Sequence, residues 1–166
     1  MKLITGLVLH ISKKEFVFIM DKKKYKIGYT TGVYDMFHIG HLNILKKAKE
    51  QCDYLIVGVS TDEVVESYKH RRPIIPFQER IAIISELRCV DRAVPQTSMD
   101  KMEAWKELHF DALFHGSDWK GTDMYNKMIS DFAEVGVDVV FLPHTEGVSS
   151  TLLSEVLYTL KEEEES

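Results

Sequence analysis

The sequence predicts an α/β protein with one Rossmann-like domain, built on a doubly wound parallel sheet. Two observations support this fold class. The 166 residues suit one domain with one hydrophobic core. From residue 25 onward, apolar runs of strand length alternate with segments of helical period, the pattern of βαβ units around a parallel sheet. A single ligand site is therefore expected.

The expected elements follow one another along most of the chain. Strands are expected at Tyr25–Thr31, Tyr54–Ser60, Arg92–Pro95, Ala112–Gly116 and Asp138–Pro143. Helices are expected at His41–Gln51, Thr61–Tyr68, Phe77–Leu87, Lys101–Leu108, Tyr125–Val135 and Ser150–Leu160. In the first of these helices, Leu42, Leu45 and Ala48 form an apolar stripe that would face the sheet.

The two ends of the chain differ from the part between them. Residues 1–24 are apolar in patches and contain three consecutive lysines, so they are interpreted as an N-terminal extension, either a hairpin or an appended segment. Met20 is a candidate start of the native protein. The domain is expected to span residues 25–160, and the glutamate-rich residues 161–166 are expected to form a solvated acidic tail.

Charge and cysteine content argue against several classes of protein. The net charge of −5 disfavours nonspecific binding to nucleic acid, because a polyanion would be repelled. Cys52 and Cys89 lack the spacing of a zinc site or a disulfide framework, which favours a reducing compartment. The apolar stretches near the N-terminus are too short to span a membrane. A soluble cytoplasmic protein is expected.

The catalytic and ligand-binding residues are expected in the loops after the strands, because ligands of a doubly wound sheet bind beyond the carboxyl ends of its strands. These loops contain Gly32–Asp35, His38–His41, Gly116–Trp119 and His144–Gly147. Among them, the two histidines that open the first predicted helix carry the most specific chemistry.

His38 and His41 are three residues apart at a helix N-terminus, which supplies unpaired N–H groups and positive potential. Both imidazoles could there donate hydrogen bonds to a nucleotide α-phosphate and its departing pyrophosphate. Gly40 would let the phosphates approach the backbone closely. Two alternatives stay open: a pair that only caps or packs the helix, and a metal pair, although no HExxH glutamate accompanies it.

The segment Thr31–His41, TGVYDMFHIGH, resembles the signature of the cytidylyltransferase family within the HxGH nucleotidyltransferases. Tyr54–Glu63, Arg88–Asp91 and Gly116–Gly121 are similar, in form and order, to segments of the bacterial glycerol-3-phosphate cytidylyltransferases. The resemblance covers residues 25–160. It implies in-line attack of an alcohol phosphate on the α-phosphate of CTP, giving a CDP-alcohol and pyrophosphate. It also implies Mg²⁺ carried by CTP, with no metal held by protein side chains, and a homodimer.

The resemblance also assigns roles to single residues by position. Those implied in catalysis are His38, His41, Lys69, Arg71 and Arg88. Those implied in nucleotide binding are Gly32, Val33, Tyr34, Asp35, Gly40, Asp118, Trp119, Thr145, Ser149 and Ser150. Within this set, Asp118 and Trp119 would hold the cytosine base. Lys101 is implied in binding the phosphate of the acceptor.

Several of these residues have a plain structural alternative. Arg88 could pair with Glu86 or Asp91 at the surface. Asp35 could be only a turn residue, because aspartate is common where a strand leaves a sheet. Trp119 could pack on the edge of the domain, and the basic run from residue 69 could be a solvated loop.

The last motif departs from the family pattern. The family commonly reads RTEGIST where this chain reads HTEGVSST from His144 to Thr151, so an imidazole replaces a fixed positive charge. The arginine of the ISSTxxR ending of adenylyltransferases is also missing, because Ser154 stands at its position. Ser149 and Ser150 keep the ability to cap the final helix and to donate to phosphate oxygens.

Transfer from CTP to glycerol 3-phosphate is the leading hypothesis, and the product would be a cell-wall or capsule precursor. Three alternatives stay open. The acceptor could be another alcohol phosphate, such as another polyol phosphate, ethanolamine phosphate or choline phosphate. The enzyme could be an adenylyltransferase, or the chain could be a nucleotide-binding module without turnover.

Overall fold

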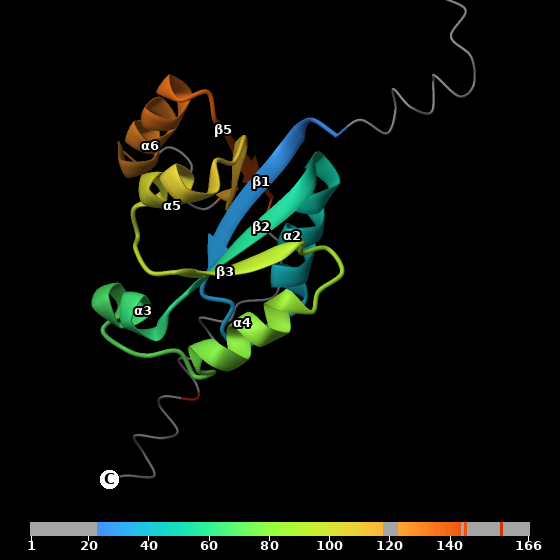
Figure 1. Ribbon diagram of the computed structural model, residues 1–166. Helices are drawn as coiled ribbons and strands as arrows, with labels where there is room; N and C mark the ends of the chain where they lie inside the picture. Colours follow the sequence, from blue (N-terminus) through green and yellow to red (C-terminus); the bar gives the residue numbers. More distant parts are fainter. Residues whose placement is uncertain (1–22, 118–122, 144, 146–156, 158–166) are drawn as a thin grey trace, which may run out of the picture.

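A five-stranded parallel sheet forms the centre of the protein. The computed structural model describes residues 23–117, 123–143, 145 and 157. In chain order the strands are β1 (Tyr25–Gly32), β2 (Cys52–Ser60), β3 (Arg92–Gln96), β4 (Ala112–Gly116) and β5 (Asp138–Leu142). They lie in the order β3-β2-β1-β4-β5, and all neighbouring pairs are parallel (Figure 1). The predicted fold class is confirmed.

Helices cover both faces of this sheet (Figure 1). They are α2 (Ile39–Gln51), α3 (Asp62–Lys69), α4 (Phe77–Ser85), α5 (Lys101–Leu108) and α6 (Asp123–Glu134). On one face, Leu45 of α2 and Ile84 of α4 join a buried cluster with β2. On the other face, Trp105 of α5 and Phe132 of α6 pack in a second cluster. Helices on both faces are the defining feature of a doubly wound sheet.

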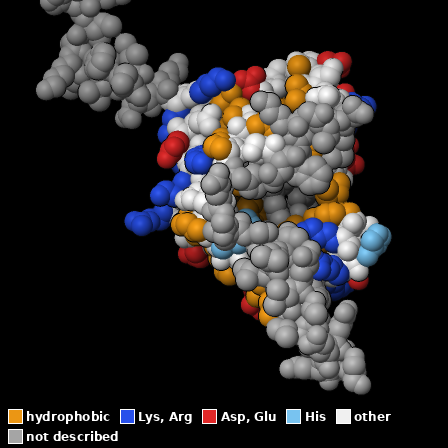
Figure 2. Space-filling model, turned by 180° about the vertical axis from the view of Figure 1, so that it is seen from behind, with side chains coloured by type: hydrophobic (Ala, Val, Ile, Leu, Met, Phe, Trp, Pro, Cys, Tyr) orange, Lys and Arg blue, Asp and Glu red, His pale blue; other side chains and the backbone are white. Residues whose placement is uncertain are grey.

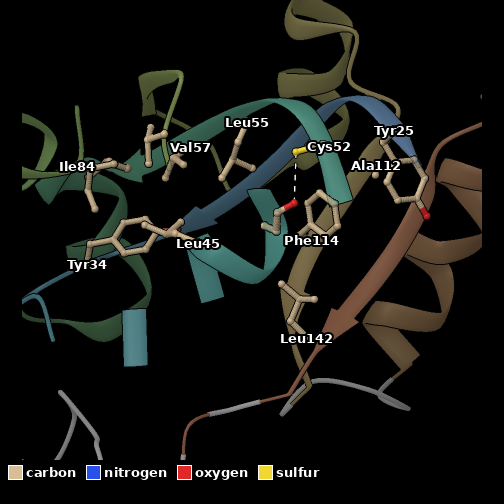
Figure 3. Packing of buried hydrophobic residues seen from close by; sticks show 13 residues of the cluster. Tyr25, Tyr34, Leu45, Cys52, Leu55, Val57, Ile84, Ala112, Phe114 and Leu142 are labelled. Carbon is tan, nitrogen blue, oxygen red and sulfur yellow. Dashed lines mark hydrogen bonds between the residues drawn. The ribbon is translucent and has the colours of Figure 1, made fainter. Parts of the chain in front are cut away.

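Alternation along β2 explains how one strand serves both faces. Leu55 and Val57 lie in the cluster of α2 and α4, whereas Ile56 lies in the cluster of α5 and α6. All three side chains are at most 4% exposed. Figure 3 shows Leu55 and Val57 beside Leu45 of α2. A strand buried on both faces needs a continuous apolar run, which is the pattern that made this strand predictable.

The order of the strands reverses next to β1. From β1 the chain builds outward through β2 and β3, and it then crosses to the other side of β1 to add β4 and β5. The crevice between the loops after β1 and β4 is thus the topological switch point, where doubly wound sheets bind their ligands. The sheet topology places the histidine motif, which follows β1, at this edge.

The observed elements match the expected ones within a few residues at each boundary. β2 begins at Cys52, directly after the last residue of α2, two residues earlier than expected. α2 begins at Ile39 because His38 caps it. Residues 1–22, most of the predicted helix at 150–160, and the predicted tail at 161–166 lie outside the described residues; within that helix range, Leu157 is helical. Across the described part of the chain, every helix is too short or too polar to cross a membrane.

Candidate active site

The chain turns sharply between β1 and α2. Tyr34 and Met36 have positive φ angles of 55° and 45°, a region that costs a non-glycine residue about 1–3 kcal/mol. The Tyr34 ring is 5% exposed, and its centroid lies 5.5 Å from that of the His41 ring in an edge-to-face contact. The structure therefore places Tyr34, a predicted nucleotide-binding residue, in the core beside His41, where it supports the imidazole.

His38 caps α2 and, together with His41, closes the first helical turn. Nδ1 of His38 accepts a hydrogen bond from the backbone N–H of Gly40 at 3.0 Å. Nδ1 of His41 accepts one from the backbone N–H of His38 at 3.4 Å. The two rings are stacked with centroids 4.0 Å apart, and Phe37 stacks on His41 at 5.5 Å. Both side chains thus cap the helix by satisfying N–H groups that the helix leaves unpaired, and a catalytic role of the pair stays a prediction.

The two caps also determine which ring nitrogen carries the proton. A neutral imidazole has one donor and one acceptor nitrogen. Because Nδ1 of each histidine accepts a backbone N–H, the proton of each neutral ring is on Nε2. Burial lowers the pKa of His38 and so favours the neutral form. Capping through Nδ1 is therefore compatible with donation from Nε2 to a phosphate oxygen.

Gly40 and Thr145 lie beside the histidine pair. A Cβ atom on Gly40 would come within 2.7 Å of Cε1 of His38, so a larger residue would displace the imidazole. Thr145, from the segment after β5, accepts a hydrogen bond on Oγ1 from Nδ2 of Asn43 at 3.1 Å. This contact holds Thr145 against the first turns of α2, and the structure therefore brings these two predicted residues together with His38 and His41.

Asp35 connects the turn after β1 to the loop that precedes α4. Its carboxylate accepts hydrogen bonds from the backbone N–H groups of Ile74 and Ile75, at 2.8 and 2.9 Å, and from that of Met36 at 3.1 Å. The side chain is 9% exposed. Asp35 is therefore more than a turn residue, because it fixes a second loop, which carries Arg71, beside the histidine turn.

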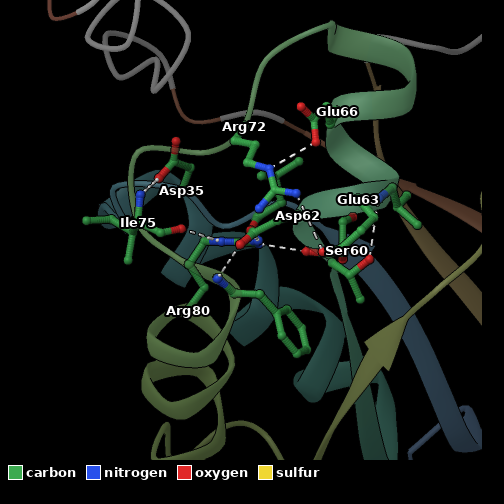
Figure 4. A network of polar contacts seen from close by, with 12 residues as sticks. Asp35, Ser60, Asp62, Glu63, Glu66, Arg72, Ile75 and Arg80 are labelled. Atoms are coloured by element: carbon green, nitrogen blue, oxygen red, sulfur yellow. Dashed lines mark hydrogen bonds and ion pairs between the residues drawn. The ribbon is translucent and has the colours of Figure 1, made fainter.

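A buried arginine that the sequence analysis did not single out holds the same region (Figure 4). Arg80 is 1% exposed, and its guanidinium donates to the backbone oxygens of Val33, Ser60 and Ile75. It also pairs with the carboxylate of Asp62 at the start of α3. Arg80 thus joins the ends of β1 and β2 to the loop before α4. Charged residues are almost never fully buried unless they are paired in this way.

The basic run after α3 divides into two parts. Arg72 pairs with Glu66 at 2.9 Å and with Glu63 at 3.8 Å on the exposed side of α3. Lys69 ends α3, and its pKa is lowered, first by partial desolvation of the ammonium and second by the charge of Arg71, while Asp35 acts in the opposite direction. Arg71 and Asp35 are therefore both close enough to Lys69 for their charges to act on its ammonium group. Figure 2 shows Lys and Arg side chains gathered beside a histidine at one side of the molecule.

A cavity of about 420 Å³ opens at the switch point. Its lining comes largely from residues at or just beyond the carboxyl ends of the strands: Thr31, Gly32, Val33, Ser60, Gln96 and His115. Lys101, Met99, Tyr68 and Tyr125 complete it. Lys101 makes no hydrogen bond or ion pair with any residue that the structure describes, and burial lowers its pKa. A half-buried ammonium of this kind favours an anionic ligand.

The model of the cytidylyltransferase-like family matches residues 29–156, most of the chain. The chain belongs to this family. The glycerol-3-phosphate cytidylyltransferase of Staphylococcus aureus is 33% identical over 130 residues, covering 78% of this chain and 92% of that protein. The protein of the same name from Bacillus subtilis is 33% identical over 127 residues, covering 76% and 92%. The family resemblance predicted from the sequence is confirmed.

A solved structure is also similar to this chain. The lipopolysaccharide core biosynthesis protein of Thermoplasma volcanium has a TM-score of 0.62 and 30% sequence identity. The similarity covers 73% of this chain and 97% of that one. The family match, over residues 29–156, includes the strands of the sheet and the loops after them.

One predicted catalytic residue of this cytidylyltransferase-like chain lies away from the others. Arg88 is exposed in the turn between α4 and the amino end of β3, whereas His38 follows the carboxyl end of β1. Its predicted surface partner Asp91 instead pairs with Lys49 at 2.6 Å and accepts the backbone N–H of Leu55. The structure does not bring Arg88 together with the histidines within one chain.

The remaining predicted residues lie outside the described part of the chain. These are Asp118, Trp119, Ser149 and Ser150, and His144 at the departure from the family pattern. Their assigned roles stay predictions. The described geometry therefore covers the histidine pair, the basic loop and the cavity, whereas the contacts to the base rest on the family assignment.

Proposed function

We propose that this chain transfers the cytidylyl group of CTP to glycerol 3-phosphate, which gives CDP-glycerol and pyrophosphate. The observation that carries the proposal is the histidine pair at the start of α2, with both Nδ1 atoms used in capping. Two relatives named glycerol-3-phosphate cytidylyltransferase, each matched over most of its length, support the choice of nucleotide and acceptor.

The reaction needs positioning and charge stabilisation more than covalent chemistry. An oxygen of the acceptor phosphate bonds to the α-phosphorus of CTP while the bond from that phosphorus to the bridging oxygen of the pyrophosphate breaks. Negative charge grows on the oxygens around the α-phosphorus and on the leaving group. Nε2–H groups of His38 and His41 and the N-terminus of α2 would stabilise this charge.

Two groups of cations would hold the phosphates on either side of the reacting atom. Lys69 and Arg71 come from the loop that Asp35 and Arg80 tie to the histidine turn. They would neutralise the triphosphate. Lys101, in the cavity, would bind the phosphate of the acceptor. The buried contacts of Asp35 and Arg80 thus hold the loop that carries Arg71 next to the histidine turn.

The residues of the site fit a Mg²⁺ ion that arrives with CTP. The carboxylate of Asp35, the buried acid nearest the histidines in sequence, already accepts three backbone N–H groups. No group of three or more His, Cys, Asp or Glu within the described ranges could hold a metal ion. The triphosphate oxygens would therefore supply the ligands of the ion, which would neutralise part of their charge.

The assembly and the biological setting are also part of the proposal. We expect a homodimer in the cytoplasm that supplies a precursor of a cell wall or capsule, as the resemblance to bacterial glycerol-3-phosphate cytidylyltransferases implies. Light scattering on the purified chain would test the dimer, because a mass near 19.2 kDa would mean a monomer.

Release of pyrophosphate tests the function directly. We expect release with Mg²⁺, CTP and glycerol 3-phosphate together, and none when ATP replaces CTP. Mass spectrometry should identify CDP-glycerol as the other product. Tight binding of CTP without release across a panel of alcohol phosphates would contradict the proposal and favour a nucleotide-binding module without turnover.

A further inference from the structure

A second cavity, here called the edge cavity, opens between α5 and β3, the strand at one edge of the sheet. Its volume is about 440 Å³, and its lining comes from β3, α5 and the loop between them, together with Tyr29 of β1. Gln96 is the only residue that lines both this cavity and the cavity at the switch point. The edge cavity is therefore separate from the proposed active site.

Tyr29 reaches the edge cavity by crossing β2. A Cβ atom on Gly58 of β2 would collide with the hydroxyl oxygen of Tyr29, so the ring crosses this strand where it has no side chain. Gly58 is in register with Val94 of β3, which lines the cavity. The ring stacks on Phe110 with centroids 4.8 Å apart. A phenol from the centre of the sheet is thus directed to a cavity at its edge.

The Tyr29 hydroxyl makes no hydrogen bond with any residue that the structure describes, although Tyr29 is only 1% exposed. Every fully enclosed polar side-chain atom in the described ranges has a partner, so this hydroxyl must keep contact with the cavity. Burial raises the pKa of the phenol, and the nearby charge of Glu107 adds to this effect, so the hydroxyl is neutral. A buried polar group without a protein partner favours a ligand that supplies one.

The lining of the edge cavity carries mainly negative charge. It contains the carboxylates of Asp100, Glu103 and Glu107, and Arg92 supplies the only positive charge among its described residues. Asp100 caps α5 by accepting the backbone N–H of Met102. Glu103 and Glu107 make no ion pair within the described ranges, and their Cβ atoms are about 5–6 Å apart because they are four residues apart on one helix. This arrangement favours a ligand with two positive charges at a similar spacing.

We propose that the edge cavity binds a short aliphatic diamine. One ammonium group would lie between the carboxylate of Glu107 and the hydroxyl of Tyr29, whose oxygen would accept one of its N–H groups. The other ammonium group would pair with Glu103. A chain of about four carbons separates two nitrogens by about one helical turn. Its methylene groups would lie against Val94 and Leu108, which supply apolar surface to the same wall.

A metal ion would fit this wall less well than an organic cation. No group of three or more His, Cys, Asp or Glu in the described part of the chain could hold one. Mg²⁺ and Ca²⁺ require a shell of oxygen ligands, whereas much of this lining is apolar. The inference goes beyond the proposed function, because none of the residues to which a part in the reaction is assigned lines the edge cavity.

Calorimetric titration of the full chain with 1,4-diaminobutane tests the proposal. An ionic strength of about 0.15 M screens nonspecific attraction between exposed charges. We expect one saturable site in the wild type, and an affinity about tenfold weaker in Glu107→Gln and in Tyr29→Phe, each of which removes one partner of the ammonium group. Glu50→Gln, at an exposed glutamate of α2, makes the same change in net charge as Glu107→Gln and should bind like the wild type.

Two further measurements complete the test. Butylamine, which has one ammonium group, should bind about tenfold more weakly than the diamine. Urea unfolding of Tyr29→Phe should give a midpoint close to that of the wild type. No CTP is present, so the result does not depend on whether the chain catalyses transfer. Absence of saturable binding, unchanged affinity in Glu107→Gln or Tyr29→Phe, or an equal loss in Glu50→Gln would overturn the proposal.

Discussion

The rings of His38 and His41 are stacked with their centroids 4.0 Å apart, and each accepts a backbone N–H of the same helical turn through Nδ1. Capping therefore uses one nitrogen of each ring, whereas a phosphate would meet the other. If the proposed function holds, stability and turnover depend on different atoms of the same two side chains. Substitutions and pH should separate these two contributions.

His41→Ala should lower turnover by about two to four powers of ten, because it removes a donor that stabilises the transition state. The fold should persist, because the substitution removes a ring contact of Tyr34 but leaves the strands of the sheet unchanged. Pyrophosphate release measures turnover, and circular dichroism with urea unfolding checks the fold. Normal turnover in a folded variant would restrict His41 to capping and packing.

His38 should make folding stability depend on pH in a predictable direction. Burial lowers its pKa from 6.5, so the unfolded chain takes up this proton at a higher pH than the folded chain. The stabilisation is complete above about pH 6.5 and is lost as the pH falls through the lower folded pKa. His38→Asn keeps a good N-cap that does not titrate. Urea unfolding between about pH 7 and pH 5 should show a steeper decline for the wild type, and parallel profiles would disprove this role.

Asp35→Asn should loosen the loop before α4. An asparagine offers one acceptor oxygen, and its NH₂ group would face a backbone N–H of Ile74 or Ile75, which costs about 1–3 kcal/mol. The loop should become more sensitive to trypsin after Lys69 and Arg71, and KM for CTP should rise by about tenfold. Asp53→Asn, at an exposed aspartate of β2, is the control. Unchanged cleavage would mean that Asp35 does not hold the loop.

Much of the fold and the centre of the site could be predicted from the sequence. Apolar runs such as Tyr54–Ser60 mark strands buried on both faces, and the histidine spacing at a helix start indicates a phosphate site. The core position of Tyr34 was not predicted. A motif match gives only the position of a residue in the chain, whereas the positive φ of Tyr34, which directs its ring into the core, is visible only in the structure.

Two arginines show the limits of this approach. Arg80 lies between Phe77 and Ile84 on the apolar stripe of α4. A charged residue within such a stripe indicates a buried ion pair, and the pair with Asp62 could have been predicted in this way. For Arg88, the match to the family motif predicted a catalytic role. The residues just before a strand lie at the amino edge of a parallel sheet, however, and this rule already placed Arg88 opposite the carboxyl ends where the ligand binds.

Arg80→Met should strongly destabilise the fold. The substitution leaves Asp62 without its buried partner and three backbone oxygens without a donor, for a loss of about 3–5 kcal/mol. Arg72→Met, at an exposed arginine in the same network of Figure 4, should leave the urea midpoint almost unchanged, because surface ion pairs contribute little. Similar midpoints for the two variants would contradict the anchoring role of Arg80.

Lys101→Met should weaken binding of the acceptor without affecting the nucleotide. The methionine keeps the apolar stem in the cavity but removes the ammonium, so KM for glycerol 3-phosphate should rise by roughly one to two powers of ten, the loss of a charged hydrogen bond. KM for CTP should stay close to wild type. Lys106→Met, at an exposed lysine of the same helix, should alter neither value. A parallel rise in both KM values for Lys101→Met would instead place this ammonium on the triphosphate, and the cavity would then have to be reassigned.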